Sequence, residues 1–144
     1  MELSQLDHVN IQTARLDETV RFFEAVLGLR PGTRPAFPFP GAWLYLGDQA
    51  VIHLIGLQPD DPAAITGSGA VNHLAFMGKD CQEFLSRISK AGIPHIVRDV
   101  PGLDQRQVFL KDPNDVTVEI SFQGEIARSG GERLEPLRLP PPAN

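Results

Sequence analysis

Four side chains that could bind a metal ion form two pairs, and the two residues of each pair are almost equally far apart in the sequence. His73 follows His8 by 65 positions, and Glu119 follows His53 by 66 positions. Imidazole nitrogens and carboxylate oxygens suit borderline divalent ions such as Fe, Ni, Zn, Co or Mn better than they suit Mg or Ca. The spacing therefore indicates a duplicated segment in which each copy carries two potential metal ligands.

Each of these side chains falls in a run of residues that alternates like a β-strand. Glu119 shares one strand face with Thr117 and Ser121, whereas the opposite face of that run is apolar. A solvent-facing sheet would give the same alternation, so one strand alone decides little. His53 and His73, however, have largely apolar neighbours on their own strand faces. A buried polar group without a partner costs about 1–3 kcal/mol, and a shared metal ion would provide both imidazoles with a partner.

These runs belong to an arrangement of strands and helices that occurs twice. A strand at 6–13 precedes an amphipathic helix at 17–28, and a strand at 70–78 precedes a second helix at 80–92. Each helix ends at a glycine and is followed by two more alternating runs. Those runs are 42–48 and 50–56 in the first half, and 106–112 and 116–122 in the second half. The segment DPND, at 112–115, predicts a tight turn that joins the last two strands into a hairpin.

Composition narrows the class of protein. A chain of 144 residues suits one domain, or two half-size repeats that share a core. The net charge of −5 and the pI near 5.3 oppose binding to nucleic acid or to an anionic membrane surface. No apolar run is long enough to span a membrane, and no leader pattern is present. The single cysteine, Cys81, excludes an internal disulfide and a cysteine-rich zinc site. These properties predict a cytoplasmic protein with a small-molecule substrate.

The two halves together resemble the vicinal oxygen chelate family, which includes glyoxalase I, methylmalonyl-CoA epimerase, fosfomycin-resistance transferases, extradiol dioxygenases and bleomycin-resistance proteins. The matching stretches, within residues 5–123, are LDHVNIQT, VRFFEAVLGLRP, VIHLI, VNHLAF and RQVFLKDPNDVTVEISF. The resemblance implies an α+β fold in which paired βαβββ modules form an incomplete barrel with a central metal cup. The implied domain spans 1–123, with repeats at about 5–57 and 70–123. An arm at 124–144 follows, and the resemblance implies a homodimer.

The resemblance also implies one divalent transition metal, Fe, Ni, Zn, Co or Mn, in this cup. His8, His73 and Glu119 match the ligand positions of the first and last strands. His53 matches the remaining ligand position, where glyoxalase I carries glutamate, and His53 and Glu119 are also the expected catalytic residues. The expected enzyme is a lyase or isomerase of the glyoxalase or epimerase type. It would chelate a substrate through adjacent oxygens and stabilise an enolate or oxyanion.

Two other functions stay open at the level of sequence. If His53 stands away from the metal, His8, His73 and Glu119 form the two-histidine, one-carboxylate set of an Fe(II)-dependent extradiol-type dioxygenase that acts on an aromatic diol. His53 would then be a candidate acid or base. The other function is a small-molecule (drug) binding or resistance protein. The presence of four metal-capable residues argues against it, because a binding cup does not need them.

The sequence departs from the glyoxalase I pattern at positions that bear on the substrate. Gln12 stands where glyoxalase I carries an arginine that holds a glutathione carboxylate, and Leu57 stands where it carries a polar glutathione contact. These differences argue against a strictly glutathione-dependent glyoxalase. Asp115 replaces the frequent glycine of the turn at 112–115, and this change is expected to affect the loop more than the chemistry.

Two features predict contacts with the substrate. The segment 35–45 is rich in aromatic and proline residues, and it suits either a wall against an aromatic substrate or a packing flap. Its candidate substrate residues are Phe37, Phe39 and Trp43. Arg106 could meet a substrate anion, with a solvated surface arginine as the alternative. The fourth histidine, His95, pairs with no ligand position and is expected to be structural or exposed.

Overall fold

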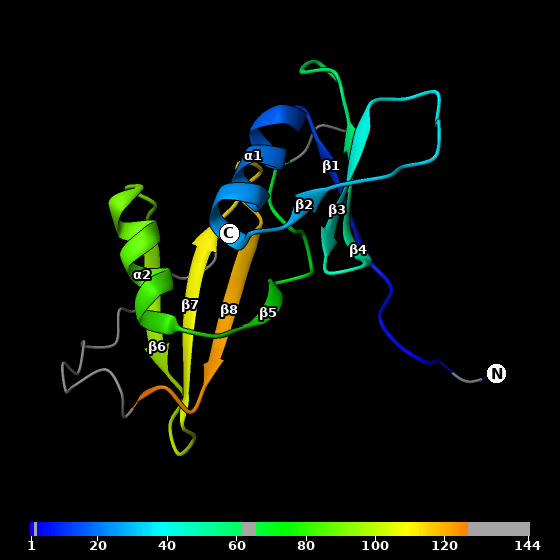
Figure 1. Ribbon diagram of the computed structural model, residues 1–144. Helices are drawn as coiled ribbons and strands as arrows, with labels where there is room; N and C mark the ends of the chain where they lie inside the picture. The colour runs from blue at the N-terminus through cyan, green and yellow to red at the C-terminus, as the bar shows by residue number, and fades with distance from the viewer. Residues whose placement is uncertain (2, 62–65, 127–144) are drawn as a thin grey trace. The chain divides into compact units, whose positions relative to one another are not determined.

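The chain folds as a strand, a helix and three strands, and then repeats this order (Figure 1). The computed structural model describes residues 1, 3–61 and 66–126. They divide into two compact units, each containing one four-stranded open sheet. Unit 1 comprises the described residues of Met1–Ser68 together with Asp112–Val116, and unit 2 comprises Gly69–Lys111 together with Thr117–Ile126. The predicted α+β fold of paired βαβββ modules without a closed barrel is confirmed.

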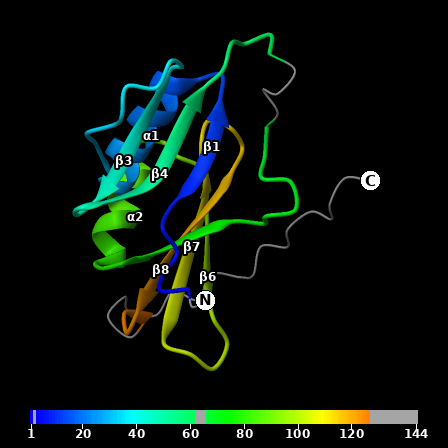
Figure 2. The same cartoon turned by 90° about the vertical axis from the view of Figure 1, so that its right-hand side faces the viewer.

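Unit 1 is a mixed sheet with one helix packed on it. Its elements are β1 (Val9–Thr13), α1 (Leu16–Leu27), β2 (Arg30–Pro31), β3 (Gly41–Leu46) and β4 (Gln49–Gly56). The strand order is β1-β4-β3-β2, in which β1 and β4 are parallel. Figure 2 shows β1, β4 and β3 side by side, with α1 behind them. Phe23 of α1 is buried with Ile52 and Leu54 of β4. His53, between those two strand residues, therefore lies on the sheet face away from α1.

Unit 2 repeats this topology. Its elements are β5 (Leu74–Gly78), α2 (Cys81–Lys90), β6 (His95–Asp99), β7 (Gln105–Lys111) and β8 (Thr117–Gln123). The strand order is β5-β8-β7-β6, in which β5 and β8 are parallel. Phe84 of α2 packs against Phe122 of β8, with ring centroids 5.6 Å apart. Glu119 and Ser121 alternate with the apolar residues of β8 and lie on the other face. Neither helix among the described residues is long and apolar enough to cross a membrane.

The structure differs from the sequence prediction mainly in the short strands. The strands predicted to begin at residues 6 and 70 begin at Val9 and Leu74, because the parallel ladders to β4 and β8 start there. His8 and His73 therefore each stand one residue before a strand. The sequence pattern did not mark β2, which has two residues, or β6, whose residues are mostly half-buried and do not alternate clearly.

The DPND turn is held by buried hydrogen bonds within unit 1. Asn114 accepts a hydrogen bond from Thr13 Oγ1 at 2.6 Å and donates through Nδ2 to Thr19 and Asp112. The Asp112 carboxylate in turn accepts from backbone N–H groups of the turn. Asp115 has φ 65°, a left-handed conformation that glycine adopts more readily. The replacement of glycine by Asp115 therefore leaves the turn as predicted and adds backbone strain to it.

The predicted arm at 124–144 lies mostly outside the described residues. The part that is described, Gly124–Ile126, belongs to unit 2. The Glu125 carboxylate accepts hydrogen bonds from the backbone N–H groups of Asp80 and Cys81 at the start of α2. The Asp80 side chain caps the same helix by accepting from the Glu83 N–H at 3.3 Å. Because two carboxylates occupy the positive end of α2, this helix terminus is satisfied within the chain.

Candidate metal centre

The two candidate ligands of unit 1 are stacked rings. The imidazole centroids of His8 and His53 are 3.7 Å apart, and their planes differ by 15°. On its other side, His53 stacks on the indole of Trp43 at 4.1 Å and 8°. Trp43 and His53 are direct partners in the antiparallel ladder of β3 and β4, which places the two rings next to each other. His53 is therefore held between two aromatic rings.

The Nε2 nitrogen of His53 is the atom of unit 1 that best suits a contact with a metal ion or a substrate. Nε2 is buried and has no hydrogen-bond partner among the described residues. Burial, together with the neighbouring His8, lowers the pKa of His53, so the imidazole is neutral at pH 7 and Nε2 can offer a lone pair. A buried acceptor without a partner lowers the stability of the folded protein by about 1–3 kcal/mol unless a metal ion or a substrate proton contacts it.

His8 is oriented in a manner that suits a metal ligand. Its Nδ1 lies 2.6 Å from the carboxylate of Asp7, and the ring is about one-third exposed. Metal-ligating histidines commonly give their second nitrogen to a carboxylate, which fixes the tautomer and raises the basicity of the ligating nitrogen. Nε2 of His8 is the nitrogen left for a metal.

Unit 2 brings His73 and Glu119 together. His73 Nε2 lies 3.1 Å from Glu119 Oε2, while His73 Nδ1 lies 2.8 Å from the Asn72 side-chain oxygen. Ligand bonds of about 2.1 Å place two adjacent donors of an octahedral ion about 3 Å apart, so this pair has the spacing of two ligands of one ion. Glu119 is only 4% exposed. A carboxylate buried to this degree needs hydrogen-bond donors or a cation.

Gln107 is a residue of this site that no sequence pattern marked. Gln107 Nε2 donates to Glu119 Oε1 at 2.7 Å, and Ser121 Oγ donates to the same oxygen at 2.6 Å. Ser121 is visible from sequence because it alternates with Glu119 on one strand. Gln105 and Gln107 also alternate along a predicted strand, but only the register of β7 against β8 shows that Gln107 reaches the Glu119 face.

The metal-capable side chains come in pairs within each unit. The described residues of neither unit include a group of three or more His, Cys, Asp or Glu side chains that could hold an ion. The chemistry of the donors nevertheless fits a divalent transition metal, because the pairs supply imidazole nitrogens and a buried carboxylate oxygen. The fourth histidine, His95, starts β6 and has Nδ1 2.8 Å from the Ile93 carbonyl, which agrees with the structural role expected for it.

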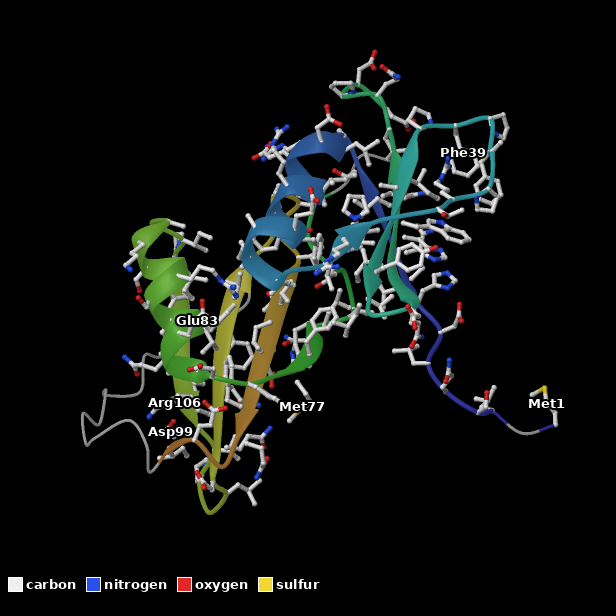
Figure 3. The ribbon with its side chains drawn as sticks, viewed as in Figure 1. Met1, Phe39, Met77, Glu83, Asp99 and Arg106 are labelled. Carbon is white, nitrogen blue, oxygen red and sulfur yellow. The ribbon has the colours of Figure 1, made fainter. Side chains whose placement is uncertain are left out.

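The aromatic segment of unit 1 extends from the stacked rings into the loop before β3. Phe37 and Phe39 stack with ring centroids 5.2 Å apart, and the guanidinium of Arg34 lies 4.9 Å from both rings. Phe37 is also 6.5 Å from Trp43, the ring beneath His53. Both phenylalanines are exposed, and Figure 3 shows Phe39 in this projecting loop. The predicted substrate residues Phe37, Phe39 and Trp43 therefore form one aromatic surface that ends at His53.

Arg106 forms an ion pair away from the candidate metal ligands of unit 2. Its guanidinium donates two hydrogen bonds to the Asp99 carboxylate, at 2.7 and 3.0 Å, and Figure 3 shows the two side chains next to each other. It also interacts with Cys81 at the start of α2. Because side chains alternate along β7, Arg106 lies on the face opposite Gln107 and hence opposite Glu119. The structure does not bring Arg106 together with the candidate metal ligands of unit 2.

Two βαβββ units, each with a four-stranded open sheet and a pair of metal-capable side chains, define a class of small duplicated α+β proteins. The model of the Glyoxalase/Bleomycin resistance protein/Dioxygenase superfamily matches residues 5–120. The chain belongs to this superfamily, and the resemblance noted from its sequence is thereby confirmed.

Individual relatives agree with this membership. The chain is 29% identical over 145 residues to Glyoxylase I 4 of Arabidopsis thaliana, a match that covers 90% of this chain and 82% of the plant protein. Its fold is shared with the glyoxylase/bleomycin resistance protein/dioxygenase domain from Frankia sp. EAN1pec, at a TM-score of 0.69 and 18% identity, covering 85% and 99% of the two chains. It is also shared with a mutant of the fosfomycin resistance protein FosX from Listeria monocytogenes, which was solved with Mn(II) and 1S,2S-dihydroxypropylphosphonic acid. That match has a TM-score of 0.66 and 16% identity, and covers 89% and 98% of the chains.

Proposed function

We propose that this protein is an enzyme that depends on one divalent transition metal and acts as a lyase or isomerase of the glyoxalase or epimerase type. The observation that carries the proposal is His53 Nε2, a neutral, buried acceptor without a partner among the described residues. The ligands are His8 and His53 from unit 1 and His73 and Glu119 from unit 2. Support comes from the superfamily match and from Mn(II) in the FosX relative of the same fold.

When bound, a divalent ion would hold two adjacent oxygens of a substrate and stabilise the negative charge that develops when a neighbouring proton leaves. The chain's own residues supply the rest of the chemistry. The neutral ring of His53 offers its Nε2 lone pair to the metal, and while it does so Nε2 does not accept a proton. The buried Glu119 provides a fixed negative charge from unit 2. The catalytic residues in this proposal are His53 and Glu119.

The aromatic surface of unit 1 indicates the class of substrate. Phe37, Phe39 and Trp43 would exclude water from one side of the substrate and favour a flat or apolar group. A small aromatic or apolar molecule with adjacent oxygens suits them better than glutathione, whose expected contacts are absent at Gln12 and Leu57. We also propose that the protein is cytoplasmic and forms a homodimer.

A second candidate function rests on the stacking of His53. If its ring stays between Trp43 and His8, His53 stands off the metal, and His8, His73 and Glu119 remain as a two-histidine, one-carboxylate set. Such a set leaves room on Fe(II) for both O₂ and an aromatic diol. The second candidate is therefore an extradiol-type dioxygenase, in which His53 is the acid or base.

Metal analysis followed by two assays tests both candidates. The protein is purified without added metal, its metal content is measured, and it is reconstituted with Mn(II), Co(II), Ni(II), Zn(II) or, without oxygen, Fe(II). Turnover of a 2-oxoaldehyde with a thiol is expected under the first proposal, and oxygen-dependent ring opening of a catechol by the Fe(II) form under the second. If the reconstituted protein binds none of these metals stoichiometrically, both candidate functions are overturned, and the protein is interpreted as a small-molecule binding protein.

Variants of three histidines then assign the ligands. We expect His8→Ala and His53→Ala both to weaken metal binding if His53 is a ligand, and His8→Ala alone to do so if His53 stands off. His95→Ala is the matched control, because His95 contacts a backbone carbonyl in unit 2 and belongs to neither pair. Equal metal affinity in all four proteins would contradict the ligand set.

A further inference from the structure

A chain of hydrogen bonds on one face of β7 and β8 ends on the Glu119 carboxylate. Gln105 Nε2 donates to Ser121 Oγ at 3.1 Å, and Ser121 Oγ donates to Glu119 Oε1 at 2.6 Å. Gln107 Nε2 donates to the same Oε1 at 2.7 Å. All four side chains lie in the antiparallel hairpin of unit 2, so the ladder between the two strands sets their spacing.

The register explains why the donors reach one carboxylate oxygen. The residue directly opposite Glu119 is Phe109, whereas Gln107 stands opposite Ser121. Gln107 is thus the diagonal neighbour of Glu119, at a distance that a long side chain can span. Gln105 is diagonal to Ser121 in the same way. A shift of the register by one residue would place these donors on the opposite face.

The direction of the hydrogen bonds follows from the donors that are available. The Ser121 hydroxyl has one hydrogen, and Gln105 donates to its oxygen, so that hydrogen is free to point at Glu119. Oε1 therefore receives two donors, which occupy its lone-pair directions. Oε2 instead faces Nε2 of His73 at 3.1 Å. The two oxygens of one carboxylate thus have different surroundings.

We propose that Gln107 and Ser121 are positioning residues that hold Glu119 as a one-oxygen metal ligand through Oε2, with Gln105 orienting Ser121. This inference rests on the proposed function, because it assumes that Glu119 binds the metal. Two donors on Oε1 prevent the carboxylate from rotating to present both oxygens to an ion. They also keep the buried carboxylate solvated by the protein before any metal arrives.

The arrangement has a consequence for the role of Glu119 in the reaction. A carboxylate that serves as a mobile base must leave the metal and turn towards the substrate. Glu119 cannot turn without breaking two charge-assisted hydrogen bonds. The ring of Phe109, the residue opposite Glu119 in the ladder, packs edge-on against His73, with ring centroids 5.9 Å apart. Glu119 is therefore a fixed ligand whose position is set by β7.

Titration of Mn(II) followed by electron paramagnetic resonance tests the inference without an activity assay. Gln107→Leu and Ser121→Ala each remove one donor with little change in volume, and each is expected to weaken Mn(II) binding about 10- to 100-fold. Ser121→Thr keeps a hydroxyl and is expected to retain most of the affinity. Gln123→Leu is the matched control, because Gln123 is an exposed glutamine on the same strand as Glu119, and its affinity should stay within about twofold of wild type, well below the second-sphere effect.

The Co(II) forms provide a second measurement, since their visible absorption reports the ligand set. Glu119→Gln is expected to change that spectrum, and Gln107→Leu is expected to shift it in the same direction by a smaller amount. Thermal unfolding of the metal-free variants shows that each one is folded, and Ser121→Ala decides the matter if Gln107→Leu does not fold.

The outcomes separate this inference from the proposed function. If wild type binds neither Mn(II) nor Co(II), the proposed function fails. If wild type binds both, Glu119→Gln does not, and Ser121→Ala and Gln107→Leu bind as wild type does, the proposed function stands and the positioning role is overturned. Loss of affinity in Gln123→Leu equal to that in Ser121→Ala would overturn it too, because the effect would then not follow the hydrogen bonds.

Discussion

His53 of unit 1 and Glu119 of unit 2 are held by different contacts. In unit 1, His53 lies between the rings of Trp43 and His8, and its Nε2 has no hydrogen-bond partner among the described residues. In unit 2, Glu119 accepts two short hydrogen bonds from Gln107 and Ser121. Stacking fixes the plane of the His53 ring, and a backbone hydrogen bond at Ala50 restrains it further. Two hydrogen bonds from side chains fix the position of one Glu119 oxygen atom. We infer that the Glu119 carboxylate is held more rigidly than the His53 ring.

Removal of the carboxylate is expected to give the largest effect. Glu119→Ala deletes a ligand and leaves its two donors without an acceptor, so we expect Mn(II) affinity to fall by more than about 100-fold, beyond the range of second-sphere changes. His53→Ala removes the softly held ligand and should cost less. Isothermal titration with Mn(II) measures both affinities, with His95→Ala as the control. A larger loss in His53→Ala than in Glu119→Ala would reverse the comparison between the units.

Unit 1 also contains a buried polar network, and its removal should affect stability alone. Asn114→Ala leaves the hydroxyls of Thr13 and Thr19 without a shared partner, and the expected loss is about 2–3 kcal/mol in the free energy of unfolding. Denaturant unfolding measures it, with the exposed Asn10→Ala in the same unit as the control. Mn(II) affinity of the folded variant should match wild type. A change in affinity with unchanged stability would mean that this network acts on the site.

The ring beneath His53 should contribute a smaller amount. Trp43→Ala removes one side of the stack, and the stacking itself is expected to account for about 0.5–1.5 kcal/mol of the loss in the free energy of unfolding, beyond the loss of buried apolar area. Trp43→Phe keeps a ring there and should recover most of this loss. Trp43 is the sole tryptophan of the chain and lies 4.1 Å from His53, so Co(II) binding to wild type is expected to quench its fluorescence. Unchanged emission with stoichiometric Co(II) would mean that the metal does not bind near His53.

The fold follows from the sequence wherever a strand is long enough to alternate. The predicted runs that contain His53 and Glu119 are the strands β4 and β8, because their apolar residues face a helix and set the phase of the strand. β2 has only two residues, both exposed, and a strand that short has no periodicity to detect. The parallel pairing of β1 with β4 and of β5 with β8 could not be predicted from the alternation.

The candidate site could be predicted less completely. The spacing of His8, His53, His73 and Glu119 identifies the residues with ligand chemistry, and the structure places them as two pairs. The contribution of Gln107 depends on the register of two strands, which no local pattern contains. Arg106 illustrates the reverse case, since its charge indicates an anion site but its partner Asp99 comes from another strand. Contacts between strands decide what a polar side chain does, and these are the contacts that a single sequence shows least.

The ion pair of Arg106 with Asp99 should give the smallest effect and a distinct dependence on pH. Hydrogen bonding from Arg106 holds the pKa of Asp99 below its ordinary value. The pair therefore stabilises the folded protein fully above the ordinary aspartate pKa of about 3.9, and this contribution is lost as the pH falls through the lower value of the folded state. Because Asp99 is 42% exposed, solvent screens the pair, and Asp99→Asn should cost below about 1 kcal/mol at pH 7. Denaturant unfolding at pH 7 and at pH 3 measures this difference, which should narrow at the lower pH.

Asp99→Asn and Arg106→Ala should both leave Mn(II) affinity unchanged, because the pair lies on the strand face opposite Glu119. An increase in KM for an anionic substrate in Arg106→Ala, with stability unchanged, would instead assign Arg106 to the substrate and show that unit 2 also binds it.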